Sequence, residues 1–510
     1  MNRHSFQCIG IVGTGAMGQG IAQVMACAGL SVRLFDARPG AASTACEHLA
    51  ARFGRLQEKG RLTPQAAAAA LAQVQVVDGL AALAGCQLVI EAIVEDLDAK
   101  QGLFRQLDEQ LPETTVLASN TSSLSITALA SVCQHPGRVA GLHFFNPVPL
   151  MRLVEVIGGL ATQPQVIDDL HALVHQIGHY PAVSKDSPGF IVNHAGRAFG
   201  TEALRMLSEG VATPGQIDAV LRDGVGFPMG PFELLDLIGL DVSLPVMESV
   251  YQQFYQEPRY KPHPLLRLMH AGGRLGRKSG QGFYAYAGKQ GAPRHVQPVP
   301  HCPVRPPVWV AGDDELGTSR VLALLEQLGA QIERTAHPSA HALCVLAPLG
   351  DDATESALRH GADPARTVAI DTLLGLDRLR CLMLTPATRA DMQQAAHALF
   401  SGDGGTVVMM RDSCGFIAQR TLASVINLAC DIAQQGIASV ADIDMAVTLG
   451  LGYPHGPLAW GDQLGAARVL HILERIHALT GDPRYRPSAW LRRRARLGLA
   501  LNQPENTVPA

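Results

Sequence analysis

A histidine and a glutamate lie twelve positions apart in a stretch with the composition of buried β-structure. His143 and Glu155 belong to GLHFFNPVPLMRLVEVI at 141–157, where apolar runs flank a segment that contains two prolines. Because proline cannot continue a strand ladder, the chain is expected to fold back there and bring both side chains together. A carboxylate beside a histidine fixes its tautomer and raises the basicity of its far nitrogen, so the pair predicts a general base. A purely structural histidine is the alternative that the spacing leaves open.

A glycine-rich turn near the N-terminus predicts a dinucleotide site. Residues 8–36 read as strand, turn, helix and strand, and the turn carries GxGxxG, whose backbone amides and helix start can receive a pyrophosphate. Asp36 ends the second strand, where a carboxylate accepts from ribose hydroxyls and repels a 2′-phosphate, so NAD is expected rather than NADP. Arg38, just past that strand, is of a type that can instead accept a 2′-phosphate. The expected cofactor contacts are Gly13, Thr14, Gly15, Ala16, Met17, Gly18 and Asp36.

A basic helical hairpin is expected between the second and third strands. Residues 40–73 are rich in alanine and are broken at Gly60 and Pro64. A solvated helix face and a site for the anionic tail of a ligand are the two interpretations of its charges. The cations are Arg52, Arg55, Lys59 and Arg61.

Polar side chains also stand where later strands of the same sheet are expected to end. Glu95 and Lys100 follow the apolar run 88–92, and a hydroxyl cluster with Asn120 and Ser122 follows the next run. Ligands of doubly wound sheets bind at this edge. The cluster is equally compatible with a helix N-cap.

The composition narrows the functional class. The chain has 510 residues and a formal net charge of -4, which argues against a nucleic-acid partner. Its ten cysteines show no CxxC spacing and no pairing with histidine, so we expect no metal site and a reducing compartment. No signal peptide and no uninterrupted apolar stretch of membrane-spanning length is evident, so we expect a soluble, cytoplasmic protein with no membrane partner.

The chain is expected to hold two copies of one helical segment. DSPGFIVN at 186–193 returns as DSCGFIAQ at 412–419, and GFPMGP at 226–231 returns as GYPHGP at 452–457, about 226 residues later in each case. An internal repeat at a fixed offset indicates duplication.

The repeat and the strand pattern together predict an α/β fold with two sheet domains and two helical domains. The predicted fold is an N-terminal Rossmann domain with a helical hairpin insertion, an all-α domain, a degenerate α/β domain and a second copy of the all-α domain. The corresponding boundaries are 1–185, 186–286, 308–411 and 412–500, with a Pro-rich linker at 287–307. In a loose alignment of the two sheets, His143 falls on Leu382 and Ser122 on Leu373, so the second half is expected to keep the scaffold without the chemistry.

Seven segments between residues 8 and 286 together resemble the NAD-dependent L-3-hydroxyacyl-CoA dehydrogenases of β-oxidation. They read GTGAMGQGIAQ, EAIVEDLDAK, ASNTSSLSI, GLHFFNPVPLMRLVEVI, KDSPGFIVN, GFPMGPFELLD and RKSGQGFY. The resemblance implies oxidation of an (S)-3-hydroxyacyl-CoA to the 3-ketoacyl-CoA, with NAD as cofactor. In its length, its duplication and the stretch LFDARPGA, the chain is most similar to family members that act on 3-hydroxyadipyl-CoA in phenylacetate degradation. Members that act on 3-hydroxybutyryl-CoA in fatty acid metabolism are the alternative.

The resemblance also implies a role for individual residues. His143 would be the base and Glu155 its orienting partner, while Ser122 and Asn193 would hold the substrate oxygen. Lys59 matches a lysine that contacts CoA, whereas Arg52 stands where the family often has a small hydroxyl residue. Further dinucleotide contacts are implied for Glu95, Lys100, Ser122 and Lys278, and further substrate contacts for Ser122 and Arg52.

Two other classes and one structural consequence accompany the resemblance. A β-hydroxyacid dehydrogenase would use a catalytic lysine, and a non-catalytic NAD-binding protein would share the fold alone. Single-repeat relatives form dimers through their helical domains. Here the two helical domains are expected to pair within one chain. A homo-oligomer formed through the same helical surface is then no longer required. Arg152, Arg197 and Arg205 are candidate partners for a distal carboxylate on the substrate.

Overall fold

The chain forms two compact units, each of which draws on distant parts of the sequence. The computed structural model describes residues 6–286, 298–300, 302 and 305–505. One unit comprises 1–194 together with 435–451, and the other comprises 195–434 together with 452–510. The linker expected at 287–307 falls largely outside the described residues. Within the described ranges, no helix has the length and apolar character needed to cross a membrane.

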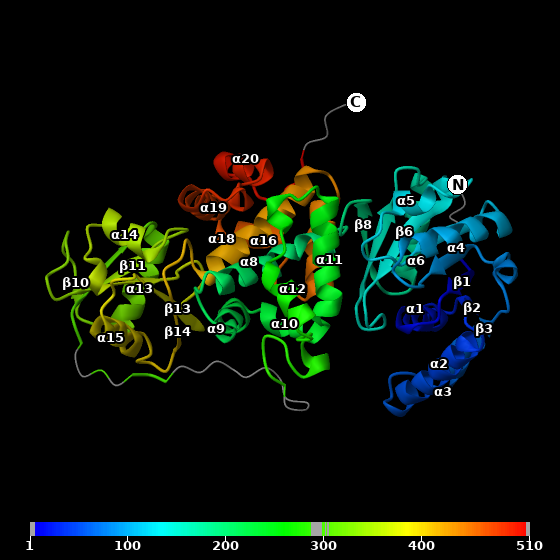
Figure 1. Cartoon of the computed structure of the whole chain (residues 1–510), viewed down its shortest axis with the longest axis horizontal. Coiled ribbons are helices and arrows are strands. Elements are labelled where there is room, and N and C mark those ends of the chain that lie inside the picture. Colours follow the sequence, from blue (N-terminus) through cyan, green and yellow to red (C-terminus); the bar gives the residue numbers. More distant parts are fainter. Residues whose placement is uncertain (1–5, 287–297, 301, 303–304, 506–510) are drawn as a thin grey trace. The chain divides into compact units, whose positions relative to one another are not determined.

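An eight-stranded sheet forms the centre of the first unit (Figure 1). Its spatial order is β3-β2-β1-β4-β5-β6-β7-β8, and every neighbouring pair is parallel except β6 and β7. The central strands, β1 and β4 to β7, are buried on both faces, as expected for a sheet covered by helices on both sides, whereas β2, β3 and β8 are only partly buried. The strands are β1 Cys8–Val12, β2 Ser31–Phe35, β3 Val74–Val76, β4 Leu88–Glu91, β5 Val116–Ser119, β6 Val139–Phe144, β7 Leu153–Gly158 and β8 Tyr180–Lys185.

Six helices connect these strands. The hairpin predicted between the second and third strands is present as α2 and α3, which extend away from α1 and β3 (Figure 1). Gly60 ends α2 with a positive φ of 65°, and Thr63 caps α3 by accepting from the amide of Ala66, which explains the break in the helical pattern. The helices are α1 Ala16–Cys27, α2 Ala41–Glu58, α3 Pro64–Ala72, α4 Leu97–Gln110, α5 Ile126–Ala130 and α6 Pro164–Gln176.

A helix from the second repeat completes the first unit. This helix, α17 (Val440–Leu451), packs on β7 and β8. The amide of Lys185 donates to the carbonyl of Ile437 at 2.8 Å, and the Tyr180 hydroxyl donates to Asp442 at 3.1 Å. The outer edge of β8 is therefore covered by residues that come about 250 positions later in the chain.

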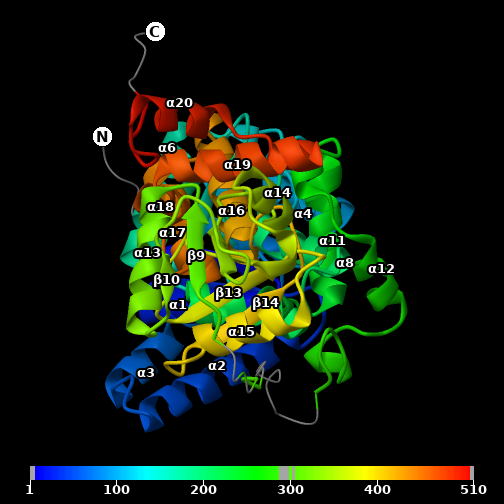
Figure 2. The ribbon, with the colours of Figure 1, turned by 90° about the vertical axis from the view of Figure 1, so that its left-hand side faces the viewer.

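The second unit contains a smaller, six-stranded sheet in the order β10-β9-β11-β12-β13-β14, with β12 and β13 antiparallel. Helices α13, α14 and α15 lie around it (Figure 2). The alternation of strands and helices predicted from Val308 onward is thus present. The elements are β9 Val308–Gly312, α13 Glu315–Gln327, β10 Ile332–Glu333, β11 Leu343–Ala347, α14 Ala353–Arg359, β12 Thr367–Ile370, β13 Leu379–Leu384, α15 Ala390–Phe400 and β14 Thr406–Met410.

The remaining helices of the second unit come from both repeats. Helices α8 and α16 pack against each other, and an ion pair at 2.7 Å between the buried Arg420 and the partly exposed Glu209 joins their ends. Pairing of the two repeats within one chain therefore occurs in this unit. The helices are α8 Arg197–Ser208, α9 Pro214–Ala219, α10 Pro231–Ile238, α11 Leu240–Gln253, α12 Pro264–Ala271, α16 Ile417–Gln434, α18 Pro457–Leu464, α19 Ala466–Thr480 and α20 Ala489–Leu497; the four-residue α7, Val192–Ala195, precedes α8.

The two halves exchange equivalent segments. The amide of Arg411, after β14, donates to the carbonyl of Val211 at 2.9 Å, which repeats the bond between Lys185 and Ile437. Each sheet thus has its last strand bonded to a segment from the other repeat. This reciprocity is consistent with the duplication inferred from the sequence repeat.

Candidate active site

The predicted histidine and glutamate are in contact. His143 on β6 and Glu155 on β7 are direct partners across the antiparallel pair, and Nδ1 of the imidazole lies 2.6 Å from Oε2 of the carboxylate. Glu155 is fully buried, and His143 is 5% exposed. The other carboxylate oxygen accepts from the backbone amides of Ile191 and Val192, each at 2.9 Å. The fold-back inferred from the proline-containing segment therefore produces the expected pair.

The surroundings of the pair favour one tautomer. All the groups around the Glu155 carboxylate are donors, which suits an ionised acid, so Nδ1 of His143 carries its proton toward it. Nε2 then keeps a lone pair and can accept a proton. The rings of Phe145 and Phe190 lie 4.3 Å and 6.1 Å from the imidazole centroid, so the basic group stands against apolar walls.

The hydroxyl cluster after β5 lies beside the pair and connects to it. The side chain of Asn120 accepts from the amide of Phe144, the residue after His143, at 2.8 Å. The amide group of Asn193 donates to the carbonyl of Ser122 at 3.2 Å. Two of the expected catalytic residues, Ser122 and Asn193, are therefore joined directly, and Asn120 links the same loop to the backbone next to His143.

A network of ionic contacts among Lys100, Glu91 and Glu95 holds the loop that carries this cluster. Lys100 is 1% exposed and contacts Glu91 at 2.5 Å and Glu95 at 3.3 Å. Glu91 also accepts from the Ser119 hydroxyl at 2.6 Å. Glu95 accepts from the amide of Ser122 at 2.9 Å. A direct contact of Glu95 or Lys100 with the dinucleotide stays a prediction, and here both hold the loop that carries Ser122.

The charge of Lys100 affects the acidity of Glu95. Burial alone would raise the pKa of Glu95, but Lys100 and the hydrogen bonds from Thr121, Ser122 and Ser123 lower it below its ordinary value. Sequence reasoning missed Glu91 and Ser119, since both lie inside apolar strand patterns. A charged residue within a buried run was the available signal.

The glycine motif has the geometry that a pyrophosphate site needs. Gly13 adopts a φ of 97°, and a Cβ there would lie 2.5 Å from the carbonyl oxygen of Ala92. A Cβ at Gly18 would collide with the carbonyl of Gly13, so the helix can pack this close only with glycine. Nothing lies within 4 Å of a Cβ at Gly15, so the turn is open on the side where α1 begins. These residues fit a bound dinucleotide.

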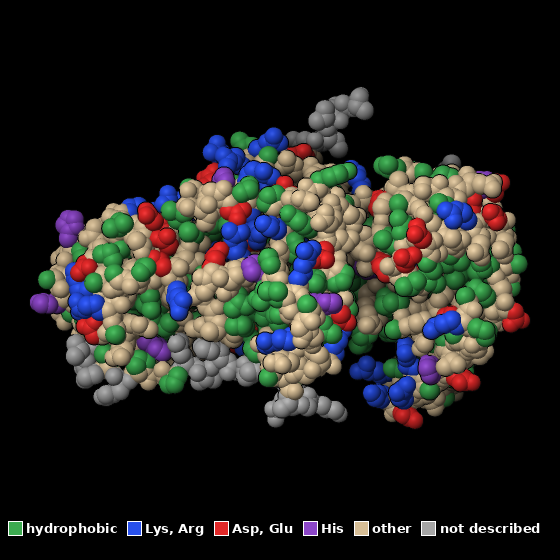
Figure 3. Space-filling model, viewed as in Figure 1, with side chains coloured by type: hydrophobic (Ala, Val, Ile, Leu, Met, Phe, Trp, Pro, Cys, Tyr) green, Lys and Arg blue, Asp and Glu red, His purple; other side chains and the backbone are tan. Residues whose placement is uncertain are grey.

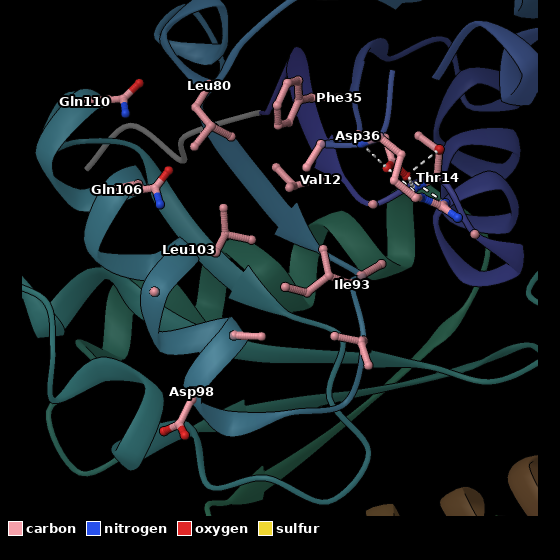
Figure 4. A pocket seen from close by; sticks show the side chains of 18 residues that line it. Val12, Thr14, Phe35, Asp36, Leu80, Ile93, Asp98, Leu103, Gln106 and Gln110 are labelled. Atoms are coloured by element: carbon pink, nitrogen blue, oxygen red, sulfur yellow. Dashed lines mark hydrogen bonds and ion pairs between the residues drawn. The ribbon is translucent and has the colours of Figure 1, made fainter. Parts of the chain in front are cut away.

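A cavity of about 950 Å³ extends from this turn (Figure 4). Phe35, Ile93 and Leu103 give it apolar walls, and Asp36 lies at its edge. Asp36 accepts from the amide and hydroxyl of Thr14, at 2.9 Å and 2.8 Å. Burial would raise the pKa of Asp36, but hydrogen bonds from Arg38 and Thr14 lower it, so the group is a carboxylate at neutral pH. The lining suits an adenosine with its ribose at the carboxylate.

The residues predicted to contact CoA, and the last predicted cofactor residue, belong to other elements of the chain. Positive side chains gather on the α2–α3 hairpin (Figure 3). Arg52 is directed at Gln19 and Gln23 of α1, at 3.5 Å each, whereas Lys59 is exposed at the end of α2. Lys278 belongs to the second unit and pairs with Asp241 at 2.8 Å. Their contacts with CoA or NAD stay predictions.

Comparison with known proteins decides the family. A family model described as 3-hydroxyacyl-CoA dehydrogenase, NAD binding domain, matches residues 8–187, and the model of the C-terminal domain of the same enzymes matches residues 189–286 and again residues 415–505. The chain belongs to the 3-hydroxyacyl-CoA dehydrogenase family. It is an NAD-dependent enzyme of that reaction class, so the lysine-dependent hydroxyacid dehydrogenase and the non-catalytic protein are set aside.

Two curated relatives and two crystal structures illustrate the match. The 3-hydroxyadipyl-CoA dehydrogenase of Escherichia coli K12 is 41% identical over 96% of this chain and 98% of its own. A probable 3-hydroxybutyryl-CoA dehydrogenase of Bacillus subtilis is 43% identical but covers 55% of this chain. A crystal structure titled 3-hydroxybutyryl-CoA dehydrogenase from Escherichia coli K12 has a TM-score of 0.85, 38% identity and 97% coverage of this chain and 99% of that one. The Ralstonia eutropha (S)-3-hydroxybutyryl-CoA dehydrogenase is 43% identical with a TM-score of 0.54, covering 56% of this chain and all of its own.

The second half of this dehydrogenase lacks the catalytic pair, as expected, but the residues at its positions differ from those inferred by alignment. Strand β13 has the length, antiparallel partner and parallel partner of β7, so Cys381 takes the position of Glu155. If the register of β12 and β13 is continued by one residue, Asp371 occupies the position that corresponds to His143. The amide of Asp371 donates to the carbonyl of Cys381 at 3.0 Å. This correspondence differs from the expected match of His143 to Leu382, which the structure pairs with Ile370 of β12.

Proposed function

We propose that this dehydrogenase oxidises (S)-3-hydroxyadipyl-CoA to 3-oxoadipyl-CoA, as required in phenylacetate catabolism. The supporting observation is that the relative named for this substrate aligns over both repeats, whereas the short 3-hydroxybutyryl-CoA relatives align with the first half. Oxidation of 3-hydroxybutyryl-CoA is the second candidate, because the crystal structure with the same full-length fold carries that name.

The contact between His143 and Glu155 is the observation that carries the proposed mechanism. Nε2 of His143 takes the proton of the substrate 3-hydroxyl, and the imidazolium that forms is stabilised by the carboxylate 2.6 Å from Nδ1. Bound NAD supplies the acceptor for the hydride that leaves C3. Because Glu155 is anchored by two backbone amides, it keeps its position while the charge on His143 changes.

Ser122 and Asn193 are proposed to hold the reacting oxygen. Their own hydrogen bond, from the Asn193 amide group to the Ser122 carbonyl, fixes the loop, and the Ser122 hydroxyl at 3.3 Å from Glu95 is only weakly engaged. A weakly held hydroxyl can reorient toward a ligand at small cost. We assign the anionic CoA tail to the hairpin cations, with Lys59 as the exposed contact and Arg52 as a cation braced on α1.

A distal carboxylate on the substrate needs a cation, and two of the candidate arginines, Arg205 and Arg197, differ in their surroundings. Arg205 is held by Glu209 at 2.9 Å and Asp482 at 2.6 Å, so its charge is already used. Arg197 follows Asn193 by one helical turn in the sequence, and burial lowers its pKa to about 10, which leaves it charged at neutral pH. We propose Arg197 as the partner of the distal carboxylate.

The test is NADH formation on 3-hydroxybutyryl-CoA, 3-hydroxyhexanoyl-CoA and 3-hydroxyadipyl-CoA, measured side by side. We expect kcat/KM for the adipyl substrate to be at least about tenfold higher, which corresponds to about 1.4 kcal/mol. Arg197→Ala should remove most of that preference and leave the butyryl value nearly unchanged, with Arg152→Ala as the matched control. Equal turnover of the uncharged substrates would move this enzyme to short-chain acyl metabolism.

A further inference from the structure

We propose that Arg38 influences the cofactor preference of this dehydrogenase through its ion pair with Asp36. With the charge of Asp36 compensated in this way, the enzyme binds NADP better than it would if Asp36 were unpaired. The family explains an aspartate at the end of β2. The ion pair that Arg38 makes with this aspartate in the dinucleotide cavity is a separate feature.

The contact between the two side chains is extensive. Nε of Arg38 lies 3.1 Å from Oδ1 of Asp36, and Nη2 lies 3.2 Å from Oδ2. The backbone amide of Arg38 also donates to Oδ1 at 3.0 Å. The side chain of Asp36 is 7% exposed whereas that of Arg38 is 74% exposed, so the guanidinium lies over the carboxylate on its solvent side.

The hydrogen bonds from Arg38 and Thr14 occupy the acceptor positions of the Asp36 carboxylate to which the ribose hydroxyls of NAD would donate. A carboxylate offers about four lone-pair positions. Thr14 donates twice to Asp36 and Arg38 donates three times, so no acceptor position is left for the ribose hydroxyls. Binding of NAD must therefore displace the Arg38 guanidinium. Because an ion pair with an exposed partner is weak, this displacement weakens NAD binding by no more than about fivefold.

Displacement leaves the guanidinium beside the ribose. Of the described residues that line the cavity, Arg38 is the one with a positive charge, and the acids there are Asp36 and Asp98. Without Arg38, a 2′-phosphate would meet only negative charge. With it, the phosphate gains a planar donor that suits phosphate oxygens. Removal of Arg38 should therefore strengthen NADH binding slightly and weaken NADPH binding.

Binding titration separates this role from catalysis. Calorimetry with NADH and NADPH gives two dissociation constants for the full-length enzyme, for Arg38→Ala and for Arg105→Ala. Arg105 is an exposed cation on α4 that does not line the cavity, so it controls for a general loss of charge. We expect the ratio of the NADPH to the NADH constant to rise at least about threefold in Arg38→Ala and to be unchanged in Arg105→Ala.

A second variant, at Asp36, tests the other partner of the ion pair. Asp36→Asn keeps the size of the side chain and removes its charge, so the ratio should fall as Arg38 becomes available to the phosphate. A change smaller than about threefold in Arg38→Ala, or an equal change in Arg105→Ala, would overturn the proposal and leave Arg38 as a surface ion pair. Neither measurement depends on turnover or on the acyl substrate.

Discussion

The amide of Asp371, the residue after β12, donates to the carbonyl of Cys381 on β13, which continues the register that pairs Ile370 with Leu382. These two residues stand where His143 and Glu155 pair across β6 and β7. Asp371 accepts from the side chain of Gln419 at 3.0 Å, and burial raises its pKa. Cys381 is buried, and burial raises the pKa of its thiol as well. An acid bonded to an amide and a neutral thiol cannot act as a histidine held by a carboxylate does.

We therefore expect one dinucleotide site in each chain. The turn between β9 and α13 carries Asp313 and Asp314 where the first half has its glycine motif, and both acids would repel a pyrophosphate. Calorimetry should give one NADH for each 510-residue chain. Asp371→Asn should keep kcat within about twofold of the parent. A stoichiometry of two would contradict the inert second half.

Replacement of His143 by Gln should abolish turnover. Glutamine fits the same space and can still donate to Glu155, but it cannot accept the hydroxyl proton, so kcat should fall by about a thousandfold. The dissociation constant for NADH should change little, because His143 does not line the adenosine cavity. A mutant that keeps a tenth of the parental rate would reject the role of the base.

The pair of Glu95 with Lys100 should make stability depend on pH. The pKa of Glu95 is lowered in the folded state, so its contribution to stability is fully present above its unfolded pKa of about 4.3. It is lost as the pH falls from there through the lower pKa of the folded state. Urea unfolding of the parent and of Glu95→Gln from pH 7 to pH 3 measures this contribution. The difference in unfolding free energy should be largest near neutral pH and should shrink in acid; a constant difference would contradict the ionic role.

A fragment that ends within the linker should self-associate. Helix α8 buries Phe199, Leu204 and Met206 in the second unit, where it packs on α16, and a fragment of residues 1–290 leaves this apolar face without its partner. We expect sedimentation velocity to show a dimer for the fragment. A stable monomer would count against the idea that the second repeat replaces a partner subunit.

Local patterns predicted much of the active site. The glycine motif, Asp36 at the end of β2 and the fold-back that joins His143 to Glu155 each follow from signals within a few residues, and each is present. The buried network around Glu91 did not follow, because its partners come from different strands. The same holds for Asp371, whose position depends on strand register. Interactions that tertiary packing creates leave little local trace.

Because the repeats exchange segments, one strand of the first sheet is synthesised long before the segment that covers it. The ribosome makes β8 long before it makes residues 435–451, which cover the outer edge of that strand in the finished unit. At typical elongation rates the delay is roughly 10 to 50 s, during which an apolar sheet edge stays open. This enzyme is thus expected to depend on chaperones during translation more than its single-repeat relatives of the same chemistry.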